Sequence, residues 1–327
     1  MNKRRKLLVA LGASALTAPL VSFAQQQGKI WRLGFVGTAS ASGYVKETDA
    51  IRAGLRDLGY VEGRNIVIEY RWAESNPERL KEMAAELVAL KVDVIITHSN
   101  AGARTAGQAT KTIPIIMADG GDPVAAGLVA SLARPGGNIT GSTSFQTDLA
   151  AKRLELLKEV VPRLKRVSVL FNALSPNNAV IFREMETAAK AMKVELHQFA
   201  VRAPEELPDA FTAMAKQRFE ATVIGEDPLL NSNAGAIAAL AATHRLPAIG
   251  QTLFPDAGGL LGYGANRPLV FGRAASFVDK ILKGAKPGDL PIERATRFEL
   301  IINLKTAKAL GIKIPQQVLQ RADKVIE

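Results

Sequence analysis

The chain has 327 residues, of which 47% are hydrophobic and 22% are charged. This composition is that of a globular protein, and the length suits one large or two medium domains. The chain contains no cysteine, which excludes disulfide bonds and a lipid anchor on an N-terminal cysteine. The formal net charge of +11 is dispersed along helix faces and forms no basic run interleaved with aromatic residues. Nucleic acid is therefore not expected as a partner.

The first residues have the layout of a secretory signal peptide. Residues 3–6 are basic, residues 7–20 are apolar, and Ser22, Phe23 and Ala24 precede a run of glutamines. This pattern predicts a signal peptide over 1–24, cleavage after Ala24 and a periplasmic location. The apolar run is short for a membrane span, so a membrane anchor is the less favoured alternative. The arginine pair leaves both Sec and twin-arginine export open. Cleavage would leave 38 Lys and Arg against 31 Asp and Glu, a net charge of +7.

From residue 30 onward, short runs rich in Val and Ile alternate with helical patterns. In the helical pattern over 48–60, Ile51, Leu55 and Leu58 share one face. Alternation of strands and helices predicts a parallel sheet covered by helices on both faces. The expected strands are 30–37, 65–72, 92–99, 113–119 and 138–145, and the expected helices of this half are 48–60 and 77–90.

The same alternation restarts near Asp148. Two successive units of about a hundred residues fit two domains better than one very wide sheet. The predicted fold class is therefore α/β, with two Rossmann-like lobes that each have a parallel central sheet. The second unit has expected helices at 148–161, 177–192, 204–219 and 231–245, and expected strands at 166–173, 195–201, 220–227 and 247–252. A further strand and helix, a Pro/Gly linker, and a last strand followed by helices complete the chain.

A short helix is predicted between Asp122 and Arg134. Asp122 and Pro123 suit the N-cap and the first helical position, and Gly120 and Gly121 allow a sharp turn before them. The residues 135–137, Pro-Gly-Gly, would end the helix. The capping pattern by itself leaves open whether this helix has a ligand role.

Ligands of open parallel sheets bind beyond the carboxyl ends of the strands, where loops lead into helices. In this chain those loops are rich in glycine and in small hydroxyl and amide residues, which expose backbone N–H groups. The sequence therefore predicts a ligand site in these loops. Its candidate residues are Thr38, Ser40, Ser99, Asn100, Ala101, Gly120, Gly121, Asp122, Asn172, Glu226 and Asp227.

The patterns that carry enzyme chemistry are missing from the sequence. The histidines His98, His197 and His244 lie in distant segments without an H-x-x-x-H spacing, so no metal site is expected. The sequence has no G-x-S-x-G elbow, no phosphate-binding G-x-x-x-x-G-K-[ST] loop and no G-x-G-x-x-G after the first strand. We therefore expect neither catalytic activity nor a cofactor.

Several segments resemble a large bacterial family of solute-binding proteins of ABC importers. The resemblance covers the mature chain, and its most specific parts are "DPVAAGLVASLARPGGNITG" from residue 122 and "INLKTAKALG" from residue 302. Characterised members of that family handle aromatic amino acids and have the type I periplasmic-binding-protein fold. The resemblance implies two lobes joined by a hinge of crossing strands. These would close on a small polar solute, such as an amino acid or related carboxylate, and deliver it to a membrane permease.

The resemblance also implies a division of the chain and roles for the candidate residues. The expected N-terminal lobe comprises 29–144 and 256–284, the C-terminal lobe 146–254 and 297–327, and the linker or hinge crossing 285–296. Ser99, Asn100 and the amides around Gly121 would hold a carboxylate of the solute, and Asp227 or Glu226 would take an amine.

Several alternatives stay open at this point. Asp227 before Pro228 also suits a plain helix cap. Tyr44, Phe145 and Tyr263 could stack on a ring of the solute or belong to the core. The expected protein is a monomer, and the alternative function is a secreted ligand-sensing subunit that presents its closed form to a membrane receptor kinase.

Overall fold

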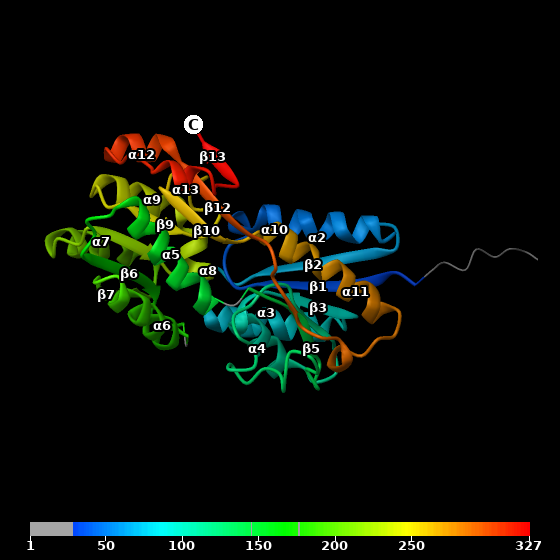
Figure 1. Ribbon diagram of the computed structural model, residues 1–327. Coiled ribbons are helices and arrows are strands. Elements are labelled where there is room, and N and C mark those ends of the chain that lie inside the picture. The colour runs from blue at the N-terminus through cyan, green and yellow to red at the C-terminus, as the bar shows by residue number, and fades with distance from the viewer. Residues whose placement is uncertain (1–28, 145, 176) are drawn as a thin grey trace, which may run out of the picture. The chain divides into compact units, whose positions relative to one another are not determined.

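The computed structural model describes residues 29–144, 146–175 and 177–327 (Figure 1). The predicted signal peptide over 1–24 and the candidate Phe145 lie outside the described residues. Trp31–Glu327 form one compact unit. Among the described residues, no helix is both long and apolar enough to cross a membrane.

The first half of the chain and one late strand build a six-stranded sheet. Its order is β11-β5-β4-β3-β1-β2, and all its pairings are parallel. Strands β3 and β4 are wholly buried, which is why their sequences are continuous apolar runs and do not alternate. The strands are β1 (Trp31–Gly37), β2 (Ile66–Trp72), β3 (Val94–Thr97), β4 (Ile115–Met117), β5 (Ile139–Thr143) and β11 (Glu293–Arg294).

Helices cover both faces of this sheet (Figure 1). Successive residues of β1 point to opposite faces, so Phe35 packs with Ile51 and Phe277 on one side while Val36 packs with Leu87 on the other. Helix α2 packs against α10 and α11, and α3 packs against α4. The bounds are η1 (Ala41–Tyr44), α2 (Val45–Asp57), α3 (Pro77–Ala89), α4 (Ser99–Ala109), α10 (Arg267–Gly272) and α11 (Ala274–Leu282).

The second half builds a seven-stranded sheet of order β13-β12-β10-β9-β8-β6-β7. Its pairings are parallel except that of β10 with β12, which is antiparallel. The prediction of two α/β halves with separate, largely parallel sheets is confirmed. The strands are β6 (Arg166–Asn172), β7 (Glu195–Val201), β8 (Ala221–Ile224), β9 (Ala248–Gly250), β10 (Leu261–Ala265), β12 (Phe298–Asn303) and β13 (Lys324–Ile326).

Two apolar clusters lie on the two faces of this second sheet. Val169 of β6 packs with Leu157 and Met185 on one face, and its neighbour Leu170 packs with Phe211 and Ile237 on the other. The helices are α5 (Gln146–Val160), α6 (Asn178–Ala191), η2 (Pro204–Glu206), α7 (Leu207–Lys216), α8 (Pro228–Ser232), α9 (Ala234–Thr243), η3 (Pro287–Asp289), α12 (Leu304–Leu310) and α13 (Gln316–Leu319).

The chain passes between the two sheets three times: after β5, after β10 and after β11. Strand β10 falls within 256–284, the segment predicted for the N-terminal lobe, and it pairs with β9 and β12 of the second sheet. The helices that follow it, α10 and α11, pack on α2. Segment 285–296, predicted as a linker, contributes β11 beside β5. The exact lobe bounds stay a prediction.

Two local expectations are wrong. The end of the chain was expected to be helical, but β13 pairs with β12 there. Residues 122–134 form turns and bends in place of a helix. The Asp122 carboxylate does accept hydrogen bonds from the N–H groups of Val124 (2.9 Å) and Ala125 (3.0 Å), as a cap would. After a single turn, however, Gly127 adopts a φ of 66°, which ends the helical path at little cost because glycine has no Cβ.

The close approach of β4 and β5 depends on a glycine, and this generates a stability prediction. Gly141 has a φ of 134°, and a Cβ there would collide with the backbone of Met117, its partner in β4. We expect Gly141→Ala to lower the free energy of unfolding by roughly 3 kcal/mol or more, measured by urea denaturation. The matched control is Gly59→Ala, where φ is 86° but no atom lies within 4 Å of the added Cβ. The control is expected to lose only about 1 kcal/mol, and equal losses would contradict this account.

Candidate functional site

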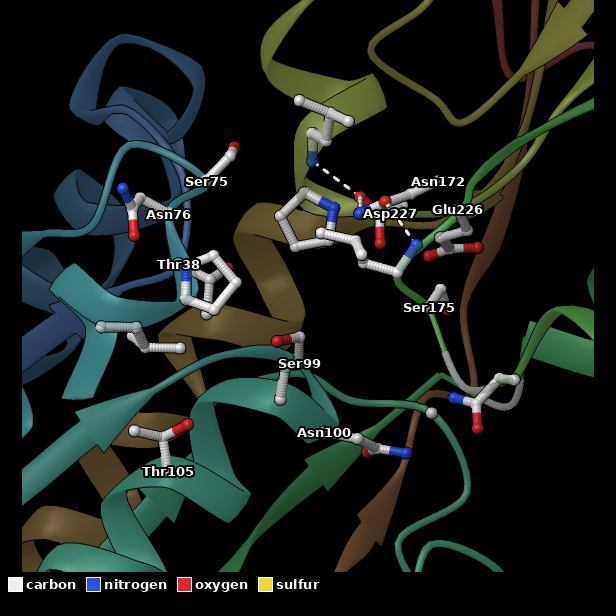
Figure 2. A pocket seen from close by; sticks show the side chains of 18 residues that line it. Thr38, Ser75, Asn76, Ser99, Asn100, Thr105, Asn172, Ser175, Glu226 and Asp227 are labelled. Carbon is white, nitrogen blue, oxygen red and sulfur yellow. Dashed lines mark hydrogen bonds between the residues drawn. The ribbon is translucent and has the colours of Figure 1, made fainter. Parts of the chain in front are cut away.

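A cavity of about 260 Å³ lies beyond the carboxyl ends of strands from both sheets. None of its described lining residues is cationic, whereas two of them are carboxylates. Figure 2 shows Thr38, Ser75 and Asn76 on one side and Asn172 and Asp227 on the other. Of the predicted site residues, the lining includes Thr38, Ser99, Asn100, Ala101, Gly121, Asn172, Glu226 and Asp227.

Three predicted residues lie outside this lining. Gly120 lines a smaller recess of about 30 Å³ that shares Ser99 and Asp227 with the cavity. Ser40 lines neither space, and its hydroxyl lies 3.2 Å from that of Ser42. Asp122 is exposed, and its carboxylate caps the turn described above.

The N-terminus of α4 forms one wall of the cavity. Ser99 has a φ of 64°, an unusual conformation for a non-glycine residue, and its N–H donates to the Asp119 carbonyl at 2.7 Å. Its hydroxyl accepts a hydrogen bond from the Gly102 N–H at 3.2 Å, which caps the helix. The N–H groups at this end of an 11-residue helix carry positive partial charge, so the wall suits a negative group.

Asn100 is nearly fully buried and is oriented by one hydrogen bond. Its side-chain Nδ2 donates to the Asp122 carbonyl at 3.3 Å, and its Oδ1 has no hydrogen-bond partner among the described residues. Asn100 therefore ties α4 to the loop after β4.

Asp227 forms the opposite wall, before α8 (Figure 2). Its Oδ1 accepts from the Leu229 N–H at 2.8 Å and from Asn172 Nδ2 at 2.9 Å, so the carboxylate also serves as the helix cap. Burial raises the pKa of Asp227, although these two hydrogen bonds oppose the shift. No cation of the described chain is paired with this carboxylate.

Glu226, the neighbouring carboxylate, is paired with a buried arginine. Arg153 donates to Glu226 Oε2 at 2.8 Å, and the side chains are 1% and 7% exposed. Arg153 also donates from Nε to the Tyr263 carbonyl at 2.7 Å. Because its charge is balanced inside the protein, Glu226 is a poorer partner for a cationic ligand than Asp227.

The recess of about 30 Å³ collects the remaining charged groups. Asp119, at the end of β4, accepts a hydrogen bond from the Ser144 hydroxyl at 2.8 Å. Burial, together with the nearby charge of Glu226, raises the pKa of Asp119 to about 7. Arg267 lies in the same recess, with its Nε 3.4 Å from Glu47 and its guanidinium 4.8 Å from the centre of the Tyr44 ring.

His98 is part of this wall and stays neutral. Burial lowers its pKa to about 3, with the Arg267 charge acting in the same direction. Its Nε2 accepts the Thr38 N–H at 3.2 Å, and its ring centre lies 4.2 Å from that of Tyr44. Among the described residues, no cluster of His, Asp or Glu could hold a metal ion.

The two candidate aromatic residues that the structure describes, Tyr44 and Tyr263, do not line the main cavity. Tyr44 lines the recess and is buried, while Tyr263 stacks on Phe298 at a ring distance of 6.4 Å in a separate surface depression. The apolar part of the main cavity is instead aliphatic. It consists of Pro77, Leu80, Leu174, Pro228 and Leu229.

Sequence reasoning missed several residues of the site. Ser75 and Asn76 follow β2, so the rule about carboxyl ends could have found them. Asn76 also caps α3, accepting from the Glu78 N–H at 2.9 Å. Arg153 and Arg267 could not have been singled out, because they lie in helices and become part of the site only through the tertiary fold.

The two sheets and the cavity at their carboxyl ends define the class of the protein, which has the fold of type I periplasmic binding proteins. Residues 36–326 match the family described as ABC transporter substrate binding protein. The chain belongs to this family. It is therefore the solute-binding component of an ABC transporter and not an enzyme, as predicted.

Individual relatives extend this assignment. The chain is 30% identical over 260 residues to the tyrosine-binding protein of Clostridioides difficile, which covers 79% of this chain and 74% of the relative. A Streptococcus pneumonia structure in complex with L-Trp is 27% identical, with a TM-score of 0.84 and coverage of 90% of this chain and 99% of that chain. The structure of a conserved domain protein of Vibrio cholerae is 27% identical, with a TM-score of 0.85 and coverage of 91% of this chain and 100% of that chain.

The Arg153–Glu226 pair generates a prediction. Arg153→Met removes the cation that pairs with the buried Glu226 carboxylate, so we expect the free energy of unfolding to fall by about 3 to 5 kcal/mol in urea denaturation. Adding Glu226→Gln should restore much of this loss, because the second change removes the buried negative charge. Losses that simply add in the double variant would show that packing, and not the charge pair, is responsible.

Proposed function

We propose that this chain is exported to the periplasm, captures a free α-amino acid with a large apolar or aromatic side chain, and delivers it to the membrane permease of an ABC importer. It acts as a monomer whose two halves close around the solute. The observation that carries the proposal is that an acidic recess and the N–H end of α4 meet at Ser99, beside a cavity whose described lining is uncharged apart from Glu226 and Asp227.

The two charged groups of an α-amino acid are separated by one carbon atom. In the site, Ser99 at the N–H end of α4 lines the same recess as the Asp227 carboxylate. The ammonium would enter the recess against Asp227, which lacks a cationic partner among the described residues. The carboxylate would accept hydrogen bonds from the first N–H groups of α4, at Asn100 and Ala101. Glu226 is less suited to the ammonium because Arg153 already balances its charge.

The rest of the solute would occupy the larger cavity. Pro77, Leu80 and Leu174 supply apolar contact, and Leu174 is 55% exposed, so a solute could cover it. Ser75, Asn76 and Ser175 could hydrogen-bond a polar atom on a ring. A volume of about 260 Å³ is near the lower end of small-molecule sites, which favours one amino acid over a peptide.

The comparisons support the same class of solute. One relative is named for tyrosine binding, and a structure of the same fold was solved with L-Trp. The family match also supports transport over the alternative of a sensor subunit for a receptor kinase. The proposed binding site comprises the predicted residues that line the cavity or the recess. Ser40 and Asp122 line neither and are not part of it.

A ligand screen tests the proposed solute. At a concentration of 100 times Kd, L-tryptophan or L-tyrosine should stabilise the mature chain by about 2.7 kcal/mol and raise its melting temperature by several degrees. Indole-3-propionate, which lacks the ammonium, and L-tryptophanamide, which lacks the carboxylate, should each give a much smaller shift. Equal shifts for L-tryptophan and indole-3-propionate would exclude the ammonium contact.

A substitution at Asp227 tests the ammonium contact directly. Asp227→Asn keeps the Oδ1 that caps α8 but removes the charge, so we expect the Kd for L-tryptophan in calorimetric titration to rise by about 100-fold. Lys190→Ala, on α6 and away from the cavity, is the control and should bind as the unsubstituted chain does. Similar affinities of the two variants for L-tryptophan would show that a group other than Asp227 binds the ammonium.

Export is tested by the N-terminus of the processed protein. Periplasmic protein from a bacterial host should begin at Gln25, as determined by mass spectrometry. Ala24→Arg places a charge at the cleavage position and should leave the full-length precursor at the membrane, whereas Gln27→Arg should be processed normally. Exported protein that retains residues 1–24 would contradict the predicted cleavage.

A further inference from the structure

We propose that Asp119, together with Glu226 and Asp227, forms a cation gate: these carboxylates come together around the recess only when a cation joins them. This cation is the ammonium of the solute or, in the empty protein, a proton. The inference rests on the proposed function for the identity of the ammonium, but its proton-dependent part stands without it.

The three carboxylates come from different sheets. Asp119 follows β4 of the six-stranded sheet, while Glu226 and Asp227 follow β8 of the seven-stranded sheet. All three line the same recess of about 30 Å³. Closing the two halves on each other therefore brings like charges together in a space with little water, where their repulsion is weakly screened.

The charged neighbours of Asp119 do not cancel this repulsion. Glu226 is paired with Arg153 at 2.8 Å, but its charge still raises the pKa of Asp119. Arg267 opposes this shift only in part, because it is paired with Glu47 at 3.4 Å. Two more titratable groups face the recess and carry no charge. Burial lowers the pKa of His98 to about 3, and burial raises the pKa of Tyr44 well above its ordinary value.

Among the described residues, Asp119 and Asp227 therefore form no ion pair, although the Arg267 charge lies in the same recess. A site that gathers two unmatched carboxylates favours a ligand with one positive charge, because the charge relieves both at once. The size of the recess bears on which cationic group of a ligand it can hold. A recess of about 30 Å³ suits a small group such as a primary ammonium better than a larger guanidinium.

The gate has a definite dependence on pH. An isolated aspartate titrates near 3.8, whereas burial and the Glu226 charge raise the pKa of Asp119 to about 7 in this arrangement. Separating the halves would move the Glu226 charge, which belongs to the other sheet, away from Asp119. The assembled recess therefore binds a proton more tightly than the separated halves do, and acidification from pH 8 to pH 6 favours closure of the empty protein. The ammonium of the solute competes with that proton, so the same acidification weakens solute binding. A purely structural aspartate would not produce these opposite effects.

The empty protein provides the first test. Small-angle scattering of the mature chain without solute should show a smaller radius of gyration at pH 6 than at pH 8. Asp119→Asn, which cannot ionise, should give the compact value at both pH values. Asp57→Asn removes a charge from the exposed face of α2 and should behave as the unsubstituted chain does. A radius that is independent of pH in the unsubstituted chain, or equally dependent in Asp119→Asn, overturns the proposal.

The second test uses L-tryptophan as the probe. Calorimetric titration of the unsubstituted chain should show Kd rising by about tenfold from pH 8 to pH 6, with release of a proton on binding. The Kd of Asp119→Asn should change little over this range. Binding of L-tryptophan without such a dependence overturns the gate and leaves the proposed function intact. Compaction of the empty protein at pH 6 without L-tryptophan binding supports the gate and overturns the proposed solute.

A measurement on the unsubstituted chain keeps the proposal testable if Asp119→Asn does not fold. Carboxyl ¹³C NMR should reveal one aspartate with a titration midpoint near pH 7, which becomes ionised throughout this range when L-tryptophan is added. Titration of every aspartate below pH 5 in the empty protein overturns the proposal.

Discussion

The site is organised by the cost of burying carboxylates. A carboxylate removed from water needs a cation or several hydrogen-bond donors, or it takes up a proton. Glu226 has Arg153, and Glu47 has Arg267. Asp227 has two donors but no cation among the described residues. The internal pairs hold the loops of the two sheets at fixed positions, and the carboxylates left without cations define where a positively charged ligand group is stabilised.

The parallel sheets determine why these groups meet. Every parallel strand ends at the same edge of its sheet, so the loops after β1, β3, β4, β6 and β8 converge although they are far apart in sequence. The positive φ of Ser99 belongs to this arrangement, because it lets α4 begin directly after β3 with its N–H end toward the cavity. Acidic groups and helix N–H groups are thus brought together without any contiguous motif.

Those features also explain how far the sequence could be read. Alternating apolar and helical segments identify both sheets, because a buried parallel strand such as β3 requires an apolar run. The carboxyl-end rule selects eight of the residues that line the cavity, since it depends only on connectivity. Capping signals are less decisive. Asp122 and Pro123 start one turn, but the left-handed Gly127 inside the segment prevents a helix that the terminal residues alone would favour.

The charge partners could not be read in the same way. Arg153 lies on the predicted helix 148–161, and nothing in its local pattern distinguishes it from the exposed cations of other helices. Its role arises because β8 and β10 bring Glu226 and the Tyr263 carbonyl to its two nitrogens. Sequence periodicity reports the direction of a side chain relative to its own element, whereas pairing depends on the distance between elements. The charge pairs of this site therefore follow from the tertiary fold and not from the local sequence.

The separation of charged from apolar groups in the cavity bears on solute specificity. Acidic groups and α4 lie at one end of the cavity, while Pro77, Leu80 and Leu174 line another part and carry no charge. Substitution of an aliphatic residue changes the shape that a solute side chain encounters but leaves the buried ion pairs intact. Substitution of a buried charge exposes its partner to the full desolvation penalty and affects the fold itself. The aliphatic residues of the cavity can consequently vary with little loss of folding stability. The same set of charged groups is therefore compatible with solutes that share the ammonium and carboxylate and differ in their side chains.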